Sequence, residues 1–599
     1  MILVFGGTTE GRKAAETLEE AGSPYYYSTK TGEQNISLHY GQRIDGAMDV
    51  EAMRSFCKEH KIRLIVDAAH PFASQLHQTI AEMAIPVIRY ERIYPPRDKD
   101  ITWIDDYAQV PTDIHTLLAT TGVQSISKLK WLEAKGVKVI YRILNRASSI
   151  ALALQQGASD DQLCFYELDY EDSSPDFPAA DAILLKESGL SGGFVGKAAE
   201  ARACGMRIIA LKRPEGFMAH GSWFKVDGPH GLRRAVERLL PDFFPLHSGL
   251  TTGTCATAAA VAAARRLLYG ETPAEVPVLL PDGETITVPV GYADGYAYCI
   301  KEAGDDPDVT DGIEVRADCR PTSGTSLNGG DWLVIEGGEG VGRFTLPGFD
   351  FSPGEAAINK GPREMLRNNL EKLITPLHSE RGRGLACTIS VPDGETIARK
   401  TFNPRLGIEG GISIIGVSGI VKPFSEEAFI DSIRKCVQVA LASGTDRIVI
   451  NSGAKSERFV KALYPMLPAQ AFVQYGNYIG ETLSIIADSS PSALHSSLKV
   501  TLGVMLGKAV KLAEGHLDTH SRRATMNRDF IARMLHKAGI KPVAADYTLA
   551  RELWERIPEC GRIPFARVVL GHCYDHCRPL LPNAELTILL IDEDGRVYE

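Results

Sequence analysis

Four aspartates in one short stretch, GDDPDVTDG, have the residue type and the density to take part in catalysis. They are Asp305, Asp306, Asp308 and Asp311. The stretch resembles a calcium-binding loop only superficially, because Thr310 and Ala317 occupy positions where ligands belong. A turn that bonds its own backbone needs fewer carboxylates than this. We therefore expect Asp306 and Asp308 to be catalytic, either by removing a proton or by positioning the hydroxyls of a bound cofactor.

A second stretch, SGLTTGTCATAAAVAAARRL at residues 248–267, joins small hydroxyl residues and glycines to an alanine-rich helix. The backbone N–H groups at such a helix start are open and bind anions. The residues that we expect to hold an anionic group of a substrate are Thr251, Thr252, Gly253 and Thr254. Cys255 could be a nucleophile, since a helix N-terminus lowers the pKa of a thiol, but we favour a small residue packed under the helix.

The N-terminal residues, MILVFGGTTEGRKAAETLEEAG, have the pattern of a strand, a glycine turn and a helix. The pattern is similar to the start of a dinucleotide-binding fold, although the second glycine follows the first directly and so departs from G-x-G-x-x-G. A glycine turn before a helix is also needed in any α/β fold. The residues that we expect to bind the phosphates of a cofactor are Gly6, Gly7, Thr8 and Gly11.

The next strand, PYYYST, ends in Ser28 and Thr29, and Lys30 follows. An acidic residue at this place would favour NADH, whereas hydroxyls and a lysine can accept the 2′-phosphate of NADPH. We expect Ser28 and Thr29 to bind the cofactor, and the choice between NADH and NADPH stays open.

Polar residues also end the later strands of the first 240 residues, such as IRLIVDAAHPFA, IPVIRYER and DAILLKESG. Ligands gather at the carboxyl ends of parallel strands. The residues that we expect to bind the substrate are Asp67, His70, Arg89, Lys186, Ser188 and Lys197. A single Asp or His at a strand end is as often a cap of its own loop.

Length and composition limit the function classes. A chain of 599 residues is too long for one core. Its net charge of −10 gives no reason to expect nucleic acid, and no apolar run is long enough to span a membrane. The N-terminus lacks the basic flank and the cleavage site of a signal peptide. The eleven scattered cysteines suit reduced thiols, so we expect a cytoplasmic enzyme.

The strand and helix rhythm predicts α/β and α+β architecture. We expect a pair of Rossmann-like parallel α/β halves over residues 1–240, divided at about 112/113. Pro241 and Pro245 mark a linker over residues 241–247. An α+β domain should follow over residues 248–430, and a second α/β domain over residues 431–599.

The last domain holds two further candidate sites. GTDRIVINSGAKS has the pattern of a buried strand followed by a helix, and we expect Asn451, Ser452 and Gly453 to bind a cofactor at the strand end. GHCYDHC brings together His572, Cys573, His576 and Cys577. Their spacing fits no standard zinc pattern, so we assign no metal to the chain.

Four motifs of the first 240 residues, GGTTEGR, DAAHPFA, RYER and KESGLSGGFVGK, together resemble the precorrin-6A reductase family of corrin biosynthesis. The resemblance implies two Rossmann-like halves and hydride transfer from a nicotinamide to a double bond of a macrocycle. The cobalt-dependent form of that pathway is usually assigned NADH and the oxygen-dependent form NADPH.

Motifs of residues 247–520 are similar to the cobalt-precorrin-5B (carbon-1) methyltransferase family. They include the helix start at residue 248, KEAGDDPDVTDG, GEAAINKGPR, TFNPRLGIEGGISIIGVSGIVKP and GKAVKLAEGHLDTH. This resemblance implies methylation of a ring carbon with S-adenosylmethionine to give cobalt-precorrin-6A, which the first enzyme would reduce. The implied partners are cobalt-precorrin tetrapyrroles, without nucleic acid or membrane, and a homo-oligomer stays open.

Two other interpretations remain. A general nicotinamide reductase fused to a cysteine or threonine acyl-transferase would use Thr252 or Cys255, with His247 or His520 as the base. A non-enzymatic tetrapyrrole carrier would need an apolar cleft and no cofactor loops, whereas two glycine-rich loops are present.

Overall fold

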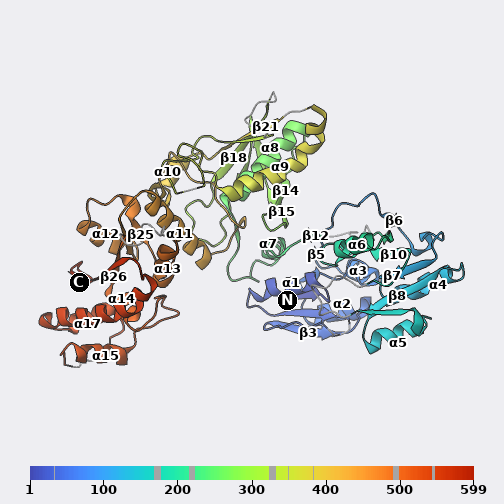
Figure 1. The fold of residues 1–599 in the computed structure, drawn as a ribbon, viewed down its shortest axis with the longest axis horizontal. Coiled ribbons are helices and arrows are strands. Elements are labelled where there is room, and N and C mark those ends of the chain that lie inside the picture. The colour runs from blue at the N-terminus through green and yellow to red at the C-terminus, as the bar shows by residue number, and fades with distance from the viewer. Residues whose placement is uncertain are drawn as a thin grey trace. The chain divides into compact units, whose positions relative to one another are not determined.

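The computed structural model describes residues 1–30, 32, 34–166, 177–214, 223–322, 332–348, 350–381, 384–489, 498–541 and 547–599. The chain forms two compact units (Figure 1). One consists of Met1–His247 with Asp282–Thr287, and the other of Ser248–Pro281 with Val288–Glu599.

The first unit begins with a six-stranded parallel sheet in the order β12-β5-β4-β1-β2-β3. Its strands are β1 (Ile2–Phe5), β2 (Tyr25–Thr29), β3 (Gly41–Asp45), β4 (Leu64–Asp67), β5 (Val87–Tyr90) and β12 (Trp223–Val226). Its helices are α1 (Thr9–Glu19), α2 (Val50–Glu59), α3 (Ser74–Ala81) and α7 (Pro229–Leu239). The central strands β1 and β4 are buried over their whole length, which explains their unbroken apolar sequences.

A second parallel sheet of six strands has the order β6-β11-β10-β7-β8-β9. Its strands are β6 (Thr102–Ile104), β7 (Thr116–Ala119), β8 (Lys138–Leu144), β9 (Leu163–Tyr166), β10 (Ala182–Lys186) and β11 (Arg207–Leu211). Its helices are α4 (Ile126–Glu133), α5 (Ala147–Gln155) and α6 (Phe194–Ala203). Separate apolar cores pack against its two faces.

The two sheets do not divide the chain at residue 112 as the sequence suggested. β6, at residues 102–104, lies at the edge of the second sheet beside β11. β12, at residues 223–226, returns to the first sheet and pairs with β5. Each sheet thus contains one edge strand from the residues that the sequence assigned to the other half.

The second unit begins with an α+β arrangement. A mixed sheet has the order β16-β17-β18-β21-β19, made of β16 (Gly291–Ala293), β17 (Tyr296–Ile300), β18 (Glu314–Thr322), β19 (Leu333–Gly337) and β21 (Gly384–Ser390). The helices are α8 (Thr252–Tyr269), α9 (Lys360–Arg381) and α10 (Gly394–Ala398). Two strand pairs complete it: β13 (Gly249–Leu250) with β23 (Ile420–Val421), and β20 (Arg343–Phe344) with β22 (Ile408–Glu409). A further two-stranded sheet consists of β14 (Glu275–Leu279) and β15 (Thr285–Pro289), and Thr285–Thr287 of β15 count with the first unit. The alanines of α8 are buried on nearly every side, so the helix fits closely against β17, β18 and α9.

An α/β arrangement ends the second unit. Its sheet has the order β25-β24-β26-β27-β28, made of β24 (Arg447–Asn451), β25 (Phe472–Gln474), β26 (Lys499–Met505), β27 (Glu585–Ile591) and β28 (Val597–Tyr598). The first four strands are parallel and β28 is antiparallel. The helices are α11 (Glu426–Ala442), α12 (Ala454–Leu463), α13 (Ile479–Ser489), α14 (Leu506–Ala513), α15 (Arg528–Lys537), α16 (Ala550–Arg556) and α17 (Glu559–Cys577).

The predicted fold class is confirmed, since two parallel α/β sheets precede an α+β part and a further α/β sheet. Within the part of the chain that the structure describes, no helix has the length and apolar character needed to cross a membrane.

Candidate active sites

Both sheets of the first unit reverse their strand order between two central strands. The reversal falls between β1 and β4 in the first sheet and between β7 and β10 in the second. Ligands of such sheets bind in the crevice outside the carboxyl ends of these strands. The sequence-predicted residues Gly6–Gly11 follow β1, Asp67 ends β4 and His70 lies in the loop after it, and Lys186 ends β10.

The glycine loop after β1 has the geometry of a phosphate-binding turn. Thr8 caps α1, because its Oγ1 accepts a hydrogen bond from the N–H of Gly11 at 2.9 Å. A side chain at Gly6 would collide with the Tyr27 hydroxyl, 2.1 Å from its Cβ. Gly7 has a φ of +82° and faces open space, so its backbone can approach a ligand closely. The loop therefore fits a dinucleotide.

Gln34 contacts this loop and was missed by sequence reasoning. Its Oε1 accepts from the N–H of Gly7 at 3.1 Å, and its Nε2 donates to the carbonyl of Thr8 at 2.9 Å. A phosphate bound to the Gly7 N–H must therefore replace the Gln34 amide. No local motif marks Gln34, because it lies in an irregular segment between β2 and β3.

The end of β2 presents both hydroxyls and charges. Ser28 and Thr29 are buried, and Thr29 Oγ1 donates to Asp45 Oδ1 at 2.7 Å. The hydrogen bond from Thr29 and then the one from Arg43 hold the pKa of Asp45 below its usual range. The negative charge of Asp45 is thus balanced by Arg43, while Lys30 stays exposed. Cofactor binding by Ser28 and Thr29 stays a prediction.

Asp67, His77 and Arg89 form a buried network beneath the loop that carries His70. Asp67 Oδ2 lies 2.7 Å from His77 Nδ1, and its Oδ1 lies 2.9 Å from Arg89 NH1. Burial alone would raise the pKa of Asp67, but His77 and Arg89 hold it below its usual range. These contacts give Asp67 and Arg89 a structural role, and substrate contact by either stays a prediction. The sequence did not single out His77 as a site residue, because it is one polar residue in a short helix.

The loops after β4 and β10 meet at a place that we call the sheet junction, formed by Glu10, His70, Phe72, Arg92, Lys186 and Ser188. Lys186 Nζ lies 5.1 Å from the centre of the Phe72 ring. Arg92 donates to the carbonyl of Ser188 at 2.8 Å and to Glu10 at 2.9 Å. Side chains from the two crevices therefore lie in contact.

His70 at the junction is a neutral imidazole. Burial and the nearby Arg92 and Lys186 lower its pKa to about 3. Its Nδ1 accepts a hydrogen bond from the N–H of Phe72 at 3.2 Å. His70 therefore carries its hydrogen on Nε2 and can donate it to a ligand.

Cations outnumber their partners around the junction. Burial, and then Lys128, lowers the pKa of Lys186 to about 8. Burial, followed by Arg142 and Arg92, also lowers the pKa of Lys197. The Nε of Arg142 is buried without a hydrogen-bond partner among the described residues. Such a concentration of positive charge suits a substrate with several carboxylates.

The predicted anion site at the start of α8 is closed by another loop of its own unit. Gly253 N–H donates to the carbonyl of Ile415 at 2.9 Å, and Thr254 Oγ1 donates to that of Gly419 at 2.6 Å. Thr252 Oγ1 accepts from the N–H of Ile415 at 2.9 Å. These bonds use donors that an anion would need, so substrate contact by Thr251–Thr254 stays a prediction that requires this loop to move. Cys255 is fully buried in α8, as the packing interpretation expects.

The acidic stretch holds its own loop together. Asp308 Oδ2 pairs with Nζ of the buried Lys301 at 2.8 Å. Asp306 Oδ1 accepts from the N–H of Phe424 at 3.0 Å, and Phe424 has a φ of +55°. A hollow of about 350 Å³ borders the stretch; its lining includes Asp311, Glu314, Arg316 and Asp393. A catalytic role for Asp306 and Asp308 stays a prediction.

The C-terminal sheet has its own reversal point, between β24 and β26. Asn451 ends β24, and its Oδ1 accepts from the N–H of Gly453 at 3.1 Å. Gly453 has a φ of +151° and open space where a side chain would stand, so a ligand can reach the start of α12. The loop fits a cofactor, and the assignment to Asn451, Ser452 and Gly453 stays a prediction.

The cluster GHCYDHC lies on α17 without converging on one point. Cys573 and Cys577 are buried in the apolar core, and Cys573 Sγ donates to the carbonyl of Ala509 at 3.4 Å. His572 Nε2 instead lies 3.2 Å from Lys537 Nζ. Among the described residues, the four do not form a group that could hold one ion.

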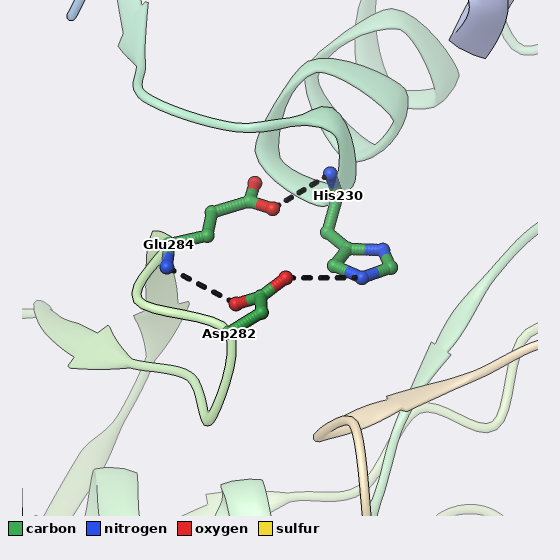
Figure 2. Close-up of side chains that lie close together, drawn as sticks. All are labelled: His230, Asp282 and Glu284. Carbon is green, nitrogen blue, oxygen red and sulfur yellow. Dashed lines mark hydrogen bonds and ion pairs between the residues drawn. The ribbon is translucent and has the colours of Figure 1, made fainter. Parts of the chain in front are cut away.

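Another group, His230, Asp282 and Glu284, was not singled out by the sequence and could hold a metal ion (Figure 2). Glu284 accepts from the backbone N–H groups of His230, at 3.0 Å, and of Gly231. Asp282 Oδ2 lies 3.6 Å from His230 Nε2. Burial raises the pKa of Glu284 to about 7, although the two N–H groups oppose the rise. Because Glu284 already bonds the start of α7, we assign it a capping role.

Comparison with known proteins agrees with the two units. Residues 1–229 match the family model described as precorrin-6x reductase CbiJ/CobK. Residues 242–423 match the CbiD model, and residues 518–598 match the model of the CbiD C-terminal domain. The cobalt-precorrin-5B C(1)-methyltransferase of Prosthecochloris aestuarii is 41% identical over 364 residues, which are 58% of this chain and 95% of that protein.

Two solved structures are also similar. The cobalamin biosynthesis protein cbiD of Archaeoglobus fulgidus is 30% identical, with a TM-score of 0.26 over 47% of this chain and 83% of that one. A CobK precorrin-6A reductase is 18% identical, with a TM-score of 0.31 over 40% of this chain and 96% of that one.

The fold and its sites define a chain of two enzymes, an oxidoreductase built on two dinucleotide-type sheets and a methyltransferase. The activities that the matched families carry are a nicotinamide-dependent reduction and an S-adenosylmethionine-dependent methylation. The chain belongs to the cobalt-precorrin-5B C(1)-methyltransferase family over its second unit, and residues 1–229 of its first unit match the CbiJ/CobK reductase family model. It is a bifunctional enzyme of cobalamin biosynthesis.

Proposed function

We propose that the chain catalyses two consecutive steps of corrin-ring assembly. The second unit methylates cobalt-precorrin-5B at ring carbon 1 to give cobalt-precorrin-6A, and the first unit reduces that product to cobalt-precorrin-6B. One observation carries the reductase part: a glycine loop with open space beside Gly7, whose N–H is held by Gln34 until a ligand replaces it, adjoins a junction where Lys186, Lys197 and Arg142 lie without carboxylate partners among the described residues. A nucleotide and a polycarboxylate macrocycle need these two features side by side.

NADPH is the nucleotide that the end of β2 favours. Bound there, it would supply the hydride. Arg43 balances Asp45, so no unpaired carboxylate opposes a 2′-phosphate at Thr29, and the exposed Lys30 adds a positive charge. Gly6–Gly11 and the start of α1 would hold the pyrophosphate.

The junction would hold the macrocycle through its carboxylates. Lys197 and Arg142 offer charge-assisted hydrogen bonds, and His70 offers a neutral N–H from Nε2. The backbone of Ser188 is fixed by Arg92, so this loop is held ready for the substrate. Asp67 and Arg89 would act beneath the surface by fixing the loop of His70.

The methyltransferase part would bind S-adenosylmethionine at the reversal point of the C-terminal sheet. Ser452 and Gly453 lie at that point, and Gly453 leaves room for close approach. S-adenosylmethionine supplies an electrophilic methyl group when it is bound. Asp306 would take up the proton that the methylated ring carbon loses, and Asp308 would keep the loop in place through Lys301.

We also infer that the protein works in the cytoplasm and stays free of nucleic acid. All eleven cysteines are free thiols, which a reducing compartment preserves. The net charge of −10 opposes binding to polyanions. Whether copies of the chain associate stays a prediction that sedimentation of the purified protein would test.

The test supplies the full chain with cobalt-precorrin-5B. With S-adenosylmethionine alone, mass spectrometry should show the gain of one methyl group. After addition of NADPH, the absorbance at 340 nm should fall by one equivalent per methyl group transferred. If the methylated product is never reduced, the reductase assignment is wrong. If the chain oxidises NADPH with supplied cobalt-precorrin-6A but does not methylate cobalt-precorrin-5B, the methyltransferase assignment is wrong.

A further inference from the structure

Lys186 stands where the two crevices of the first unit meet. It is the last residue of β10, at the reversal point of the second sheet. Its Nζ lies 5.1 Å from the centre of the Phe72 ring, and Phe72 follows β4 at the reversal point of the first sheet. A nicotinamide bound to the first sheet would lie at that same crevice. Lys186 thus faces the expected hydride donor from the opposite sheet.

Lys186 has no carboxylate within ion-pair distance in the part of the chain that the structure describes. The neighbouring acid, Glu187, is already paired with Arg97 at 2.9 Å and with Arg213 at 2.8 Å. By contrast, Lys212, at the end of the adjacent strand, pairs with Asp105 at 3.0 Å. An unpaired ammonium group is free to act on a ligand.

The charged groups that face Lys186 weaken its hold on its proton. Lys128 of α4 repels it, and His70, from the loop after β4, is neutral. Arg92 lies beside His70, and its own charge is balanced by Glu10. Burial, followed by the repulsion from Lys128, lowers the pKa of Lys186 to about 8. An acid of this strength is protonated at neutral pH yet releases its proton readily.

Reduction of a ring double bond requires a proton as well as a hydride. The guanidinium groups of Arg92 and Arg142 do not release protons, and the neutral His70 is too weak an acid to supply one. Of the groups described at the junction, Lys186 and Lys197 remain as candidate proton donors. Lys186 differs from Lys197 in its place over Phe72.

We propose that Lys186 is the proton donor of the reduction, an inference that rests on the proposed reductase function. The hydride and its electron pair form a C–H bond at one carbon of the conjugated system. The displaced π-electron pair, at the other end of that system, takes a proton from the ammonium group of Lys186. The N–H bond breaks, the nicotinamide is oxidised, the macrocycle is reduced by two electrons, and the neutral amine regains a proton from water.

The experiment compares the wild-type chain with Lys186→Arg, using cobalt-precorrin-6A and NADPH, from pH 6 to pH 10. Arginine keeps the positive charge that a carboxylate needs but cannot release a proton. Wild-type kcat/KM, which reports the pKa of the free enzyme, should fall as pH rises through about 8, because the ammonium form is the active one. Lys186→Arg should lower kcat by about 10²–10³-fold and leave KM within a small factor. The fall above pH 8 should also be lost in this variant.

Lys212→Arg is the matched control. It makes the same replacement at a lysine that directly follows the adjacent strand β11 and pairs with Asp105, and we expect it to retain the fall in kcat/KM above pH 8. A Lys186→Met variant should lose kcat as Lys186→Arg does and should also raise KM, since the charge is gone. NADPH affinity by fluorescence titration shows that each variant is folded.

The outcomes distinguish a failure of this inference from a failure of the proposed reductase function on which it rests. If wild type oxidises NADPH and Lys186→Arg keeps both its kcat and its fall above pH 8, Lys186 only binds the substrate and the inference is wrong. A rise in KM alone in Lys186→Arg has the same meaning. If the wild-type chain oxidises no NADPH with this substrate, the proposed reductase function fails, and the inference fails with it.

Discussion

Glu10 and Arg92 form a buried ion pair, with 2.9 Å between Oε2 and Nε and side chains that are 8% and 6% exposed. Glu10 stands in the first turn of α1, directly after the glycine loop. Arg92 follows β5 and also donates to the carbonyl of Ser188 in the second sheet's loop. Ser191, from that loop, donates to Glu10 as well. The pair therefore fixes the expected nucleotide site against the expected substrate site.

Replacement of Glu10 by glutamine should destabilise the first unit. The change leaves the guanidinium of Arg92 buried without a counter-charge, and breaking one side of a buried pair costs about 3–5 kcal/mol. Urea unfolding followed by tryptophan fluorescence and by NADPH binding would measure the loss. Glu51→Gln is the matched control, because Glu51 pairs with Arg54 at the exposed surface and should contribute little. Equal midpoints for both variants would show that the pair is not needed.

Replacement of Gly7 by valine should abolish NADPH binding and leave methyl transfer intact. A β-branched side chain is strained at a φ of +82°, and it would fill the open space that a phosphate needs. Calorimetric titration with NADPH measures the effect. Gly22→Val is the control, since Gly22 has a φ of +65° but lies beyond the far end of α1. Unchanged NADPH affinity in Gly7→Val would show that the nucleotide does not bind at this loop.

The local elements of the first unit could be predicted from the sequence, whereas their pairing could not. The strand before Gly6 and the polar ends of β4 and β10 are visible as apolar runs followed by polar residues. The return of β12 to the first sheet depends on hydrogen bonds to β5, more than a hundred residues earlier, which no local pattern encodes. The boundary between the two halves that sequence order predicts therefore puts β6 and β12 in the wrong half.

The site residues show the same limit. Strand-end residues such as His70 and Lys186 could be predicted as candidates because parallel strands bring their ends together. His77 and Gln34 were missed because their importance comes from tertiary contacts, with Asp67 and with the glycine loop, that no local pattern marks. The start of α8 was predicted as an open anion site because its sequence cannot reveal that Ile415, some 160 residues later, occupies its donors.

Asp308 should stabilise the second unit in a pH-dependent way. Burial would raise its pKa, but Lys301, only 1% exposed, and the hydrogen bonds from Thr310 hold it below its usual range. A carboxyl with a lowered pKa in the folded state stabilises above its unfolded pKa of about 3.9 and loses this effect as pH falls through the folded value. The melting temperature of the second unit should therefore fall steeply below about pH 4.

The Asp308→Asn variant tests the origin of that dependence. It leaves the ammonium of Lys301 buried without its partner, so stability at pH 7 should fall by about 3–5 kcal/mol. The difference between variant and wild type should shrink as pH falls below about 4, and it should be smallest below the lowered pKa of folded Asp308, where the carboxyl is protonated in both states. A constant difference down to pH 2 would assign the effect to something other than the ion pair.

Asp306 allows a substitution that separates catalysis from structure. Its Oδ1 accepts a hydrogen bond from the N–H of Phe424, a residue with a φ of +55°. The amide oxygen of asparagine can accept the same bond, so Asp306→Asn should keep this loop and remove only the basic carboxylate. If Asp306 takes up the proton, kcat for methyl transfer should fall by about 10²–10⁴-fold while the Kd of S-adenosylmethionine stays the same. Asp306→Ala serves as the comparison, because it also loses the bond to Phe424 and should lower the melting temperature. Full activity in Asp306→Asn together with a destabilised Asp306→Ala would leave Asp306 with a structural role alone.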